Sequence, residues 1–111
     1  MRFFETIFTD EVNHFMAKLD WKSANKVLYN IDLAEQTNDP RLIKKLKNDI
    51  WEMRTNYSGN QLRLLAFWDK TDHERTLVIA ALGFIKKTKK VPQSEINHAL
   101  QIRNQYFKNK R

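Results

Sequence analysis

Apolar residues in the first third of the chain recur at helical spacing. A short segment at residues 3–8 is rich in aromatic and β-branched side chains, a composition typical of a strand. Apolar side chains then return every three or four positions through residues 10–19 and again through residues 21–36, which places them on one face of a helix. Pro40 cannot continue a helix. The pattern therefore predicts a strand followed by two consecutive helices.

The periodicity changes to that of strands in the middle of the chain. Residues 41–49 read as a basic connection that allows a turn of helix. Residues 50–56 then alternate between apolar and polar positions, and residues 61–68 form a second apolar run. The two runs are separated by Ser58-Gly59-Asn60, a typical hairpin turn sequence. We therefore expect an antiparallel hairpin here.

A third strand and a closing helix complete the predicted order. Residues 76–85 are almost continuously apolar, which indicates a strand covered on both faces and so central in its sheet. Pro92 suits a first helical turn, and the residues after it are amphipathic. The order strand, two helices, three strands, helix predicts an α+β fold. We expect a small two-layer sandwich with a mainly antiparallel, twisted sheet, forming a single domain over residues 1–111.

The positive charge of the chain is concentrated in its last quarter. The net charge is +7, yet residues 1–83 carry twelve Lys/Arg and twelve Asp/Glu. Residues 84–111 carry eight Lys/Arg and one Glu. Four of these lysines fall within residues 86–90, where the third strand ends. A one-sided basic distribution predicts attraction to nucleic acid or another polyanion.

Several classes of protein are excluded by what the chain lacks. There is no cysteine, so neither a disulfide framework nor a Cys-based zinc site exists. The three histidines do not share metal-ligand spacing, and no Gly-rich phosphate loop is present, so we expect no metal and no cofactor. The first residues are too acidic for a signal peptide, and no apolar run approaches a membrane span. These features predict a cytoplasmic protein without a membrane partner.

Three sequence blocks carry a resemblance to a known family. They are Ile50-Trp51-Glu52-Met53-Arg54, Leu62-Arg63-Leu64-Leu65, and the stretch from Gly83 to Pro92 with Glu95-Ile96 and Ala99-Leu100 after it. In this order and spacing the chain resembles the RelE/HigB superfamily of toxin ribonucleases, and within it the phage-derived HigB-like branch.

The resemblance implies a type II toxin that inhibits translation. Its activity would be metal-independent cleavage of mRNA, commonly on the ribosome. Its partner would be a small antitoxin encoded beside it, often one with a helix-turn-helix DNA-binding part.

Four cations are the predicted catalytic residues: Arg54, Arg63, Lys86 and Lys87. The arginines sit on the paired strands of the hairpin, and a guanidinium donates two parallel hydrogen bonds to a phosphate. The alternative interpretation makes Arg54 an ordinary strand residue paired with an acid, and makes Arg63 a partly buried structural residue. Glu52 is the one acid beside the predicted groove, and it could act as a base, orient Arg54, or have a structural role.

Further residues are predicted to bind the nucleic acid without taking part in the reaction. The lysines among them would hold phosphates, Thr88 would donate a hydrogen bond or satisfy its own backbone, and Tyr57 would stack on a base. The set is Lys89, Lys90, Thr88, Tyr57, Lys45 and Lys47. Two other functions remain open: a non-catalytic module that uses the same basic surface on RNA, DNA or the ribosome, and a protein-interaction role.

Overall fold

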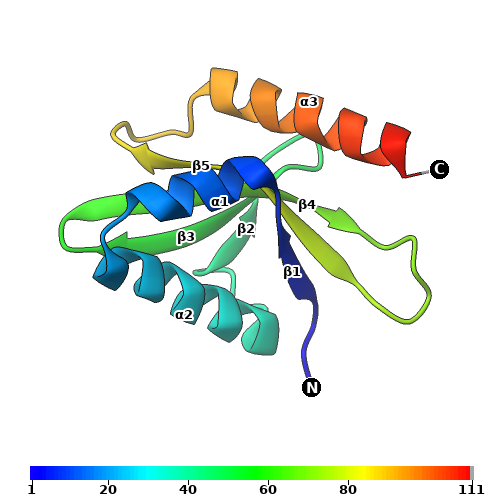
Figure 1. The fold of residues 1–111 in the computed structure, drawn as a ribbon, viewed down its shortest axis with the longest axis horizontal. Helices are drawn as coiled ribbons and strands as arrows, with labels where there is room; N and C mark the ends of the chain where they lie inside the picture. Colours follow the sequence, from blue (N-terminus) through cyan, green and yellow to red (C-terminus); the bar gives the residue numbers. More distant parts are fainter. Residues whose placement is uncertain (111) are drawn as a thin grey trace.

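The predicted α+β class is confirmed by the computed structural model, which describes residues 1–110. Three helices surround a five-stranded sheet (Figure 1). The elements run in the order β1 (Glu5–Phe8), α1 (Asp10–Lys18), α2 (Trp21–Thr37), β2 (Ile43–Lys45), β3 (Trp51–Tyr57), β4 (Asn60–Asp69), β5 (Leu77–Lys86) and α3 (Gln93–Asn109).

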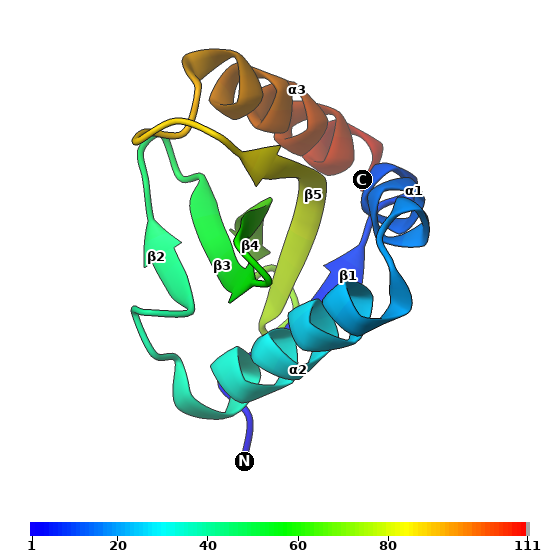
Figure 2. The ribbon, with the colours of Figure 1, turned by 90° about the vertical axis from the view of Figure 1, so that its left-hand side faces the viewer.

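The sheet is mixed but mainly antiparallel, with spatial order β1-β5-β4-β3-β2. β1 pairs with β5 in parallel, and the other three pairings are antiparallel. β5 has a neighbour on each side, so its nearly continuous apolar sequence reflects burial on both faces, as predicted. β1 and β2 form the two edges, and α1 runs beside β1 at the edge away from β2 (Figure 2).

The expectation for residues 41–49 was wrong, because this segment contains the edge strand β2. Ile43, Lys44 and Lys45 pair with Met53, Glu52 and Trp51 of β3. Three residues are too few to show a period, and only Ile43 is buried. Exposed lysines on a very short edge strand are a common defence against pairing with another chain.

The predicted hairpin is confirmed, with a two-residue loop between β3 and β4. Ser58 has φ 52° and Gly59 has φ 81°, so both loop residues are left-handed, as in a type I′ turn. This turn sets the register in which Arg54 lies directly opposite Arg63. The local turn therefore decides which cations face each other.

Apolar side chains pack on both faces of the sheet. Leu62, Leu64 and Ala66 of β4 join the cluster that includes residues of α1 and α2, whereas Leu65 and Phe67 join the cluster that includes residues of α3. In Figure 1, α2 lies below the sheet and α3 lies above it. Alternate side chains of β4 thus point into two separate cores, one formed with α1 and α2 and the other formed with α3.

A glycine allows the first helix to approach the central strand. A side-chain carbon at Gly83 of β5 would overlap the ring of Phe15 from α1. Because glycine has no Cβ, the Phe15 ring can pack directly against the backbone of β5. Gly83 therefore has a packing role, besides preceding the lysines at the end of β5.

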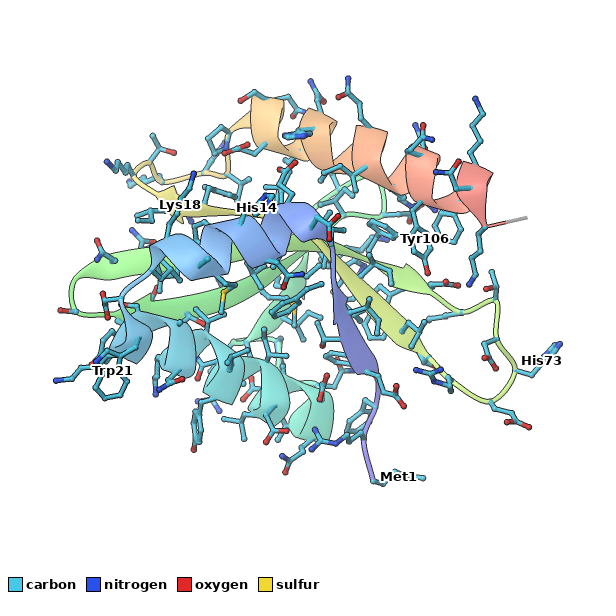
Figure 3. The ribbon with its side chains drawn as sticks, viewed as in Figure 1. Met1, His14, Lys18, Trp21, His73 and Tyr106 are labelled. Atoms are coloured by element: carbon cyan, nitrogen blue, oxygen red, sulfur yellow. The ribbon has the colours of Figure 1, made fainter. Side chains whose placement is uncertain are left out.

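A buried carboxylate connects the C-terminal helix to the end of β4. Asp69 is 1% exposed and accepts hydrogen bonds from Tyr106 Oη at 2.6 Å and from the backbone N–H and hydroxyl of Thr71 at 3.0 and 2.7 Å. Lys110 Nζ lies 3.3 Å from the same carboxylate. Burial raises the pKa of Asp69, but these donors outweigh it and hold the pKa at about 2. Burial, and to a smaller extent the hydrogen bond to Asp69, raises the pKa of Tyr106 to about 12 (Figure 3).

Candidate nucleic-acid interface

The sheet register brings polar side chains from three strands to one face. Arg54 of β3 lies opposite Arg63 of β4, and Arg63 lies opposite Phe84 of β5. Gln61 and Lys86 form the next pair on the same face, because side chains alternate along a strand. The face is shared with Leu65 and Phe67, so it is the side of the sheet on which α3 packs.

A basic groove opens where this face meets the loop before α3. It has a volume of about 330 Å³. Its lining comes from β2 and the turn after it, from β3, from the end of β5, and from the loop and first turn of α3. The lining residues are Lys44, Leu46, Lys47, Glu52, Arg54, Lys86, Lys89, Lys90, Val91 and Ile96. Six cations and a single acid make this groove a strongly positive concave surface, the kind that attracts an anionic polymer.

Glu52 lies at the base of the groove between the two arginines of the hairpin. It is 2% exposed. Its Oε1 lies 3.2 Å from Nε of Arg54, and its Oε2 lies 3.2 Å from Nε of Arg63. A buried carboxylate needs such partners, because an unpaired charge in the protein interior is strongly destabilising. Glu52 thus bridges two cations and fixes the position of both.

The two arginines differ sharply in exposure. The side chain of Arg54 is 32% exposed and lines the groove, and within residues 1–110 Glu52 is the one acid paired with it. Its guanidinium is therefore anchored at Nε while part of it remains accessible to a ligand. The geometry suits a donor that reaches a phosphate from a fixed base.

Arg63 is buried, with a side chain only 3% exposed. Its Nη1 donates to the carbonyl oxygens of Leu62 and Thr55 at 3.0 and 3.4 Å and to Oδ1 of Asn56 at 3.0 Å, and its Nη2 donates to Oε1 of Gln61 at 3.2 Å. Burial lowers the pKa of Arg63 from its usual range, against the attraction of Glu52. With these partners Arg63 supports the groove from beneath, which agrees with the structural alternative considered for it from the sequence.

The structure gathers only part of the predicted site. Arg54, Lys86, Lys89, Lys90 and Lys47 line the groove together. Lys44 lines it as well and was missed, because its place depends on the unrecognised strand β2. Had that strand been recognised, its pairing with β3 would have set Lys44 opposite Glu52.

Four predicted residues lie elsewhere. Lys87 is exposed but does not line the groove, and the alternation of β2 turns Lys45 away from the face of Lys44. Tyr57 shares the face of Met53 and Thr55, opposite to Arg54. The hydroxyl of Thr88 donates to the carbonyl oxygen of Lys90 at 2.6 Å, so it satisfies the local backbone.

The described part of the chain holds no cluster of three or more His, Cys, Asp or Glu side chains arranged to bind a metal ion. Within residues 1–110 no helix has the length and apolar character required to cross a membrane.

Fold and groove together define a small basic α+β domain whose concave face suits an anionic ligand. A family model described as phage-derived protein Gp49-like (DUF891) matches residues 14–104, and the chain belongs to this family. The family falls broadly within the RelE/HigB-like type II toxins. A search of curated proteins finds no match to the chain.

Proposed function

We propose that this protein is the toxin of a type II toxin–antitoxin system, a metal-independent endoribonuclease that cleaves mRNA on the ribosome and so inhibits translation in the cytoplasm. One observation carries the proposal. Six cations converge on one groove whose only acid is already paired with two arginines. The groove therefore has an excess of positive charge available for a phosphodiester. Membership of a toxin family supports the same conclusion.

In the proposed reaction the 2′-hydroxyl oxygen of the RNA attacks the adjacent phosphorus and the bond to the 5′-oxygen breaks. The products are a cyclic phosphate and a 5′-hydroxyl, so one proton leaves the nucleophile and one reaches the leaving oxygen. Negative charge builds up on the phosphorane between these events. A positioned donor to such a charge is worth about 3–4 kcal/mol by analogy with oxyanion sites.

We assign the contact with the scissile phosphate to Arg54 and Lys86, which line the groove from β3 and the end of β5. Lys44, Lys47 and the pair Lys89–Lys90 would hold the flanking phosphates. Arg63 then becomes a positioning residue, because both of its Nη atoms donate within the protein and it acts on the groove through its ion pair with Glu52. Lys87 was predicted from the sequence to be catalytic but does not line the groove, so we assign it no part in the reaction, and the experiment below tests this.

A protein partner completes the proposal. A toxin needs an antitoxin, and we propose a small antitoxin with a helix-turn-helix part encoded near this chain. Co-expression with the product of the neighbouring gene should restore growth. If no neighbouring gene encodes a protein that restores growth, the toxin–antitoxin assignment fails while RNA cleavage remains open.

A non-catalytic RNA-binding module is the second candidate, and Glu52 is the observation in its favour. Both carboxylate oxygens of Glu52 lie beside an arginine, so the groove offers no unpaired carboxylate as a general base. A binding module would hold RNA in the groove and leave its phosphodiesters intact. The two candidates therefore differ in whether transcripts are cut.

The decisive experiment is induced expression followed by mapping of transcript ends, with matched lysine variants. Wild-type protein should stop growth and create new 5′ ends within mRNAs. Lys86→Ala should reduce the frequency of new ends by tenfold or more, since one lost donor is worth at least about 1.4 kcal/mol. Lys87→Ala removes the same charge outside the groove and should leave cutting within twofold of wild type.

Each other result has a defined meaning. Growth arrest without new RNA ends would select the binding module. Equal loss of cutting in both lysine variants would contradict the assignment of the groove and restore the role predicted for Lys87 from the sequence.

A further inference from the structure

A second basic pocket lies at the end of the sheet where β3 begins and β4 ends. It has a volume of about 540 Å³. Its lining comes from the end of α2, from β2 and the turn after it, from β3 and β4, and from α3. The lining residues are Asn38, Lys45, Asp49, Trp51, Trp68, Lys70 and Arg103. The groove proposed above contains none of these residues.

The charges of this pocket are poorly neutralised within the protein. Within residues 1–110, no acid pairs with Lys45 or Lys70. Asp49 is the one acid in the lining, and it lies 3.9 Å from Nη2 of Arg103, at the outer limit of an ion pair. Three cations against one weakly held acid leave a local excess of positive charge. Such a concave excess attracts an anion.

Two buried N–H groups of the lining residues also lack an acceptor. Nε1 of Trp68 and Nε of Arg103 are inaccessible to solvent and have no hydrogen-bond partner within the described residues. Buried donors are nearly always satisfied, so unpaired ones are often explained by a ligand or water. Both atoms lie behind the surface of the pocket, so the positive charge of the lining, rather than these two donors, is what the pocket offers to a ligand.

The wall of the pocket is aromatic. The rings of Trp51 and Trp68 meet edge to face with their centroids 5.5 Å apart, and Nζ of Lys70 lies 5.1 Å from the Trp68 ring centroid. Aromatic side chains beside cations are the usual combination in sites for single-stranded nucleic acid. A pocket for a simple inorganic anion would not need this wall.

The position of the pocket relates it to the groove. Lys44 and Lys45 are consecutive on β2 and serve the groove and the pocket respectively. Along α3, Ile96 lines the groove and Arg103 lines the pocket, seven residues or about 10 Å further on. The groove and the pocket are thus separated by the width of β2 and by about two turns of α3.

We infer that this pocket is a second RNA-binding site, which holds a nucleotide of the single strand beyond the one in the groove. The inference rests on the proposed function, since it extends the path of the same RNA. It gives Lys45 a role in RNA binding on the face of β2 opposite to Lys44. Lys45, Lys70 and Arg103 would hold the phosphate, and the tryptophans would border the base.

The three tryptophans of the chain allow a direct test by fluorescence. Trp21 is 70% exposed at the start of α2, where it projects into solvent (Figure 3). In a Trp21→Phe protein the two remaining indoles, Trp51 and Trp68, both line the pocket. A single-stranded RNA oligonucleotide with an end label reports total binding by anisotropy, while indole emission reports occupation of the pocket. We expect both signals to change over the same RNA concentrations.

Charge variants in the same background provide the second readout. Lys45→Ala and Lys70→Ala should each weaken RNA binding several-fold and reduce the slope of log affinity against log salt by about one. Lys26→Ala removes a lysine that lies over Tyr29 on α2 and should change neither quantity.

RNA binding seen by anisotropy without any change in indole emission would overturn the second site and leave the groove intact. Wild-type affinity and salt slope in both pocket variants would do the same. An absence of RNA binding by any signal would overturn the second site together with the proposed function.

Discussion

The described residues include two buried carboxylates, Glu52 near the start of β3 and Asp69 at the end of β4, and they are held in opposite ways. Asp69 is bonded by a tyrosine, a threonine and a lysine, and it connects α3 to β4. Glu52 is flanked by two arginines, and one of them is open to a groove. Both are almost fully buried. Burial of an acid therefore does not by itself separate a structural centre from a functional one.

The partners make the difference. The Asp69 centre is satisfied largely by neutral donors that belong to the local fold, so it has little to offer a ligand. Glu52 has one negative charge and two arginines beside it, so one positive charge is not neutralised. Arg54 is partly exposed and presents this charge in the groove. A buried acid with surplus cations around it is thus the better indication of an anion-binding site.

The largest expected effect comes from removing the arginine beneath the groove. Arg63→Ala leaves Glu52 with only one cation and should lower the free energy of unfolding by about 3–5 kcal/mol, as breaking a buried ion pair does. Arg41→Ala removes an arginine of which 88% is exposed and which pairs with Asp39 at 2.7 Å. It should leave the free energy of unfolding close to the wild-type value, because solvent screens an exposed ion pair.

Urea denaturation of the purified variants measures both values. If the two arginine variants lose similar amounts of stability, the burial of the Glu52 centre has no energetic meaning and the comparison fails.

A smaller effect, of opposite kind, is expected at the other carboxylate. The pKa of Asp69 is about 2 in the folded protein and 3.8 in a free side chain. As the pH falls, the carboxylate is therefore protonated in the unfolded state before it is protonated in the folded state. Its contribution of about 2 kcal/mol is present above pH 4 and is lost as the pH falls from 4 to 2. Asp69→Asn should remove this part of the acid dependence of stability while cleavage of RNA persists at neutral pH.

Tyr106→Phe sharpens the same test, because it removes one donor and keeps the carboxylate. Loss of this donor should raise the folded-state pKa of Asp69 towards its unfolded value. The acid-induced loss of stability should therefore be smaller than in wild-type protein, as measured by urea denaturation followed by circular dichroism across pH 2–5. A wild-type acid profile in both variants would show that the hydrogen bonds of Asp69 do not lower its pKa.

The sequence was sufficient for the parts of the fold that depend on local chemistry. The turn at Ser58-Gly59, the helical stripes before Pro40 and the apolar strand β5 were all predicted, because each has its own residue pattern. β2 was missed, since three residues of an edge strand are held by backbone pairing with β3 and leave no periodic trace. Because β2 was missed, Lys44 on this strand was not predicted to line the groove.

The candidate site could be predicted only as a set of charges. The turn at Ser58-Gly59-Asn60 predicted that Arg54 and Arg63 lie on paired strands, and the register places them directly opposite each other. Their different exposure could not be foreseen, since it depends on Asn56 and Gln61 closing around one guanidinium. Likewise, nothing in the adjacent lysines of the loop separates Lys86 from Lys87; the end of β5 decides which one faces the groove.

The central claim is that Arg54, the partly exposed arginine beside Glu52, acts on an RNA phosphodiester. The most direct measurement is the frequency of new transcript ends after induction of wild-type protein and of Arg54→Ala at equal protein levels. The account predicts abundant cuts with wild type and a reduction of a hundredfold or more in the variant, the loss of about 3 kcal/mol expected for one donor to a developing charge. Undiminished cutting by a folded Arg54→Ala protein would contradict it.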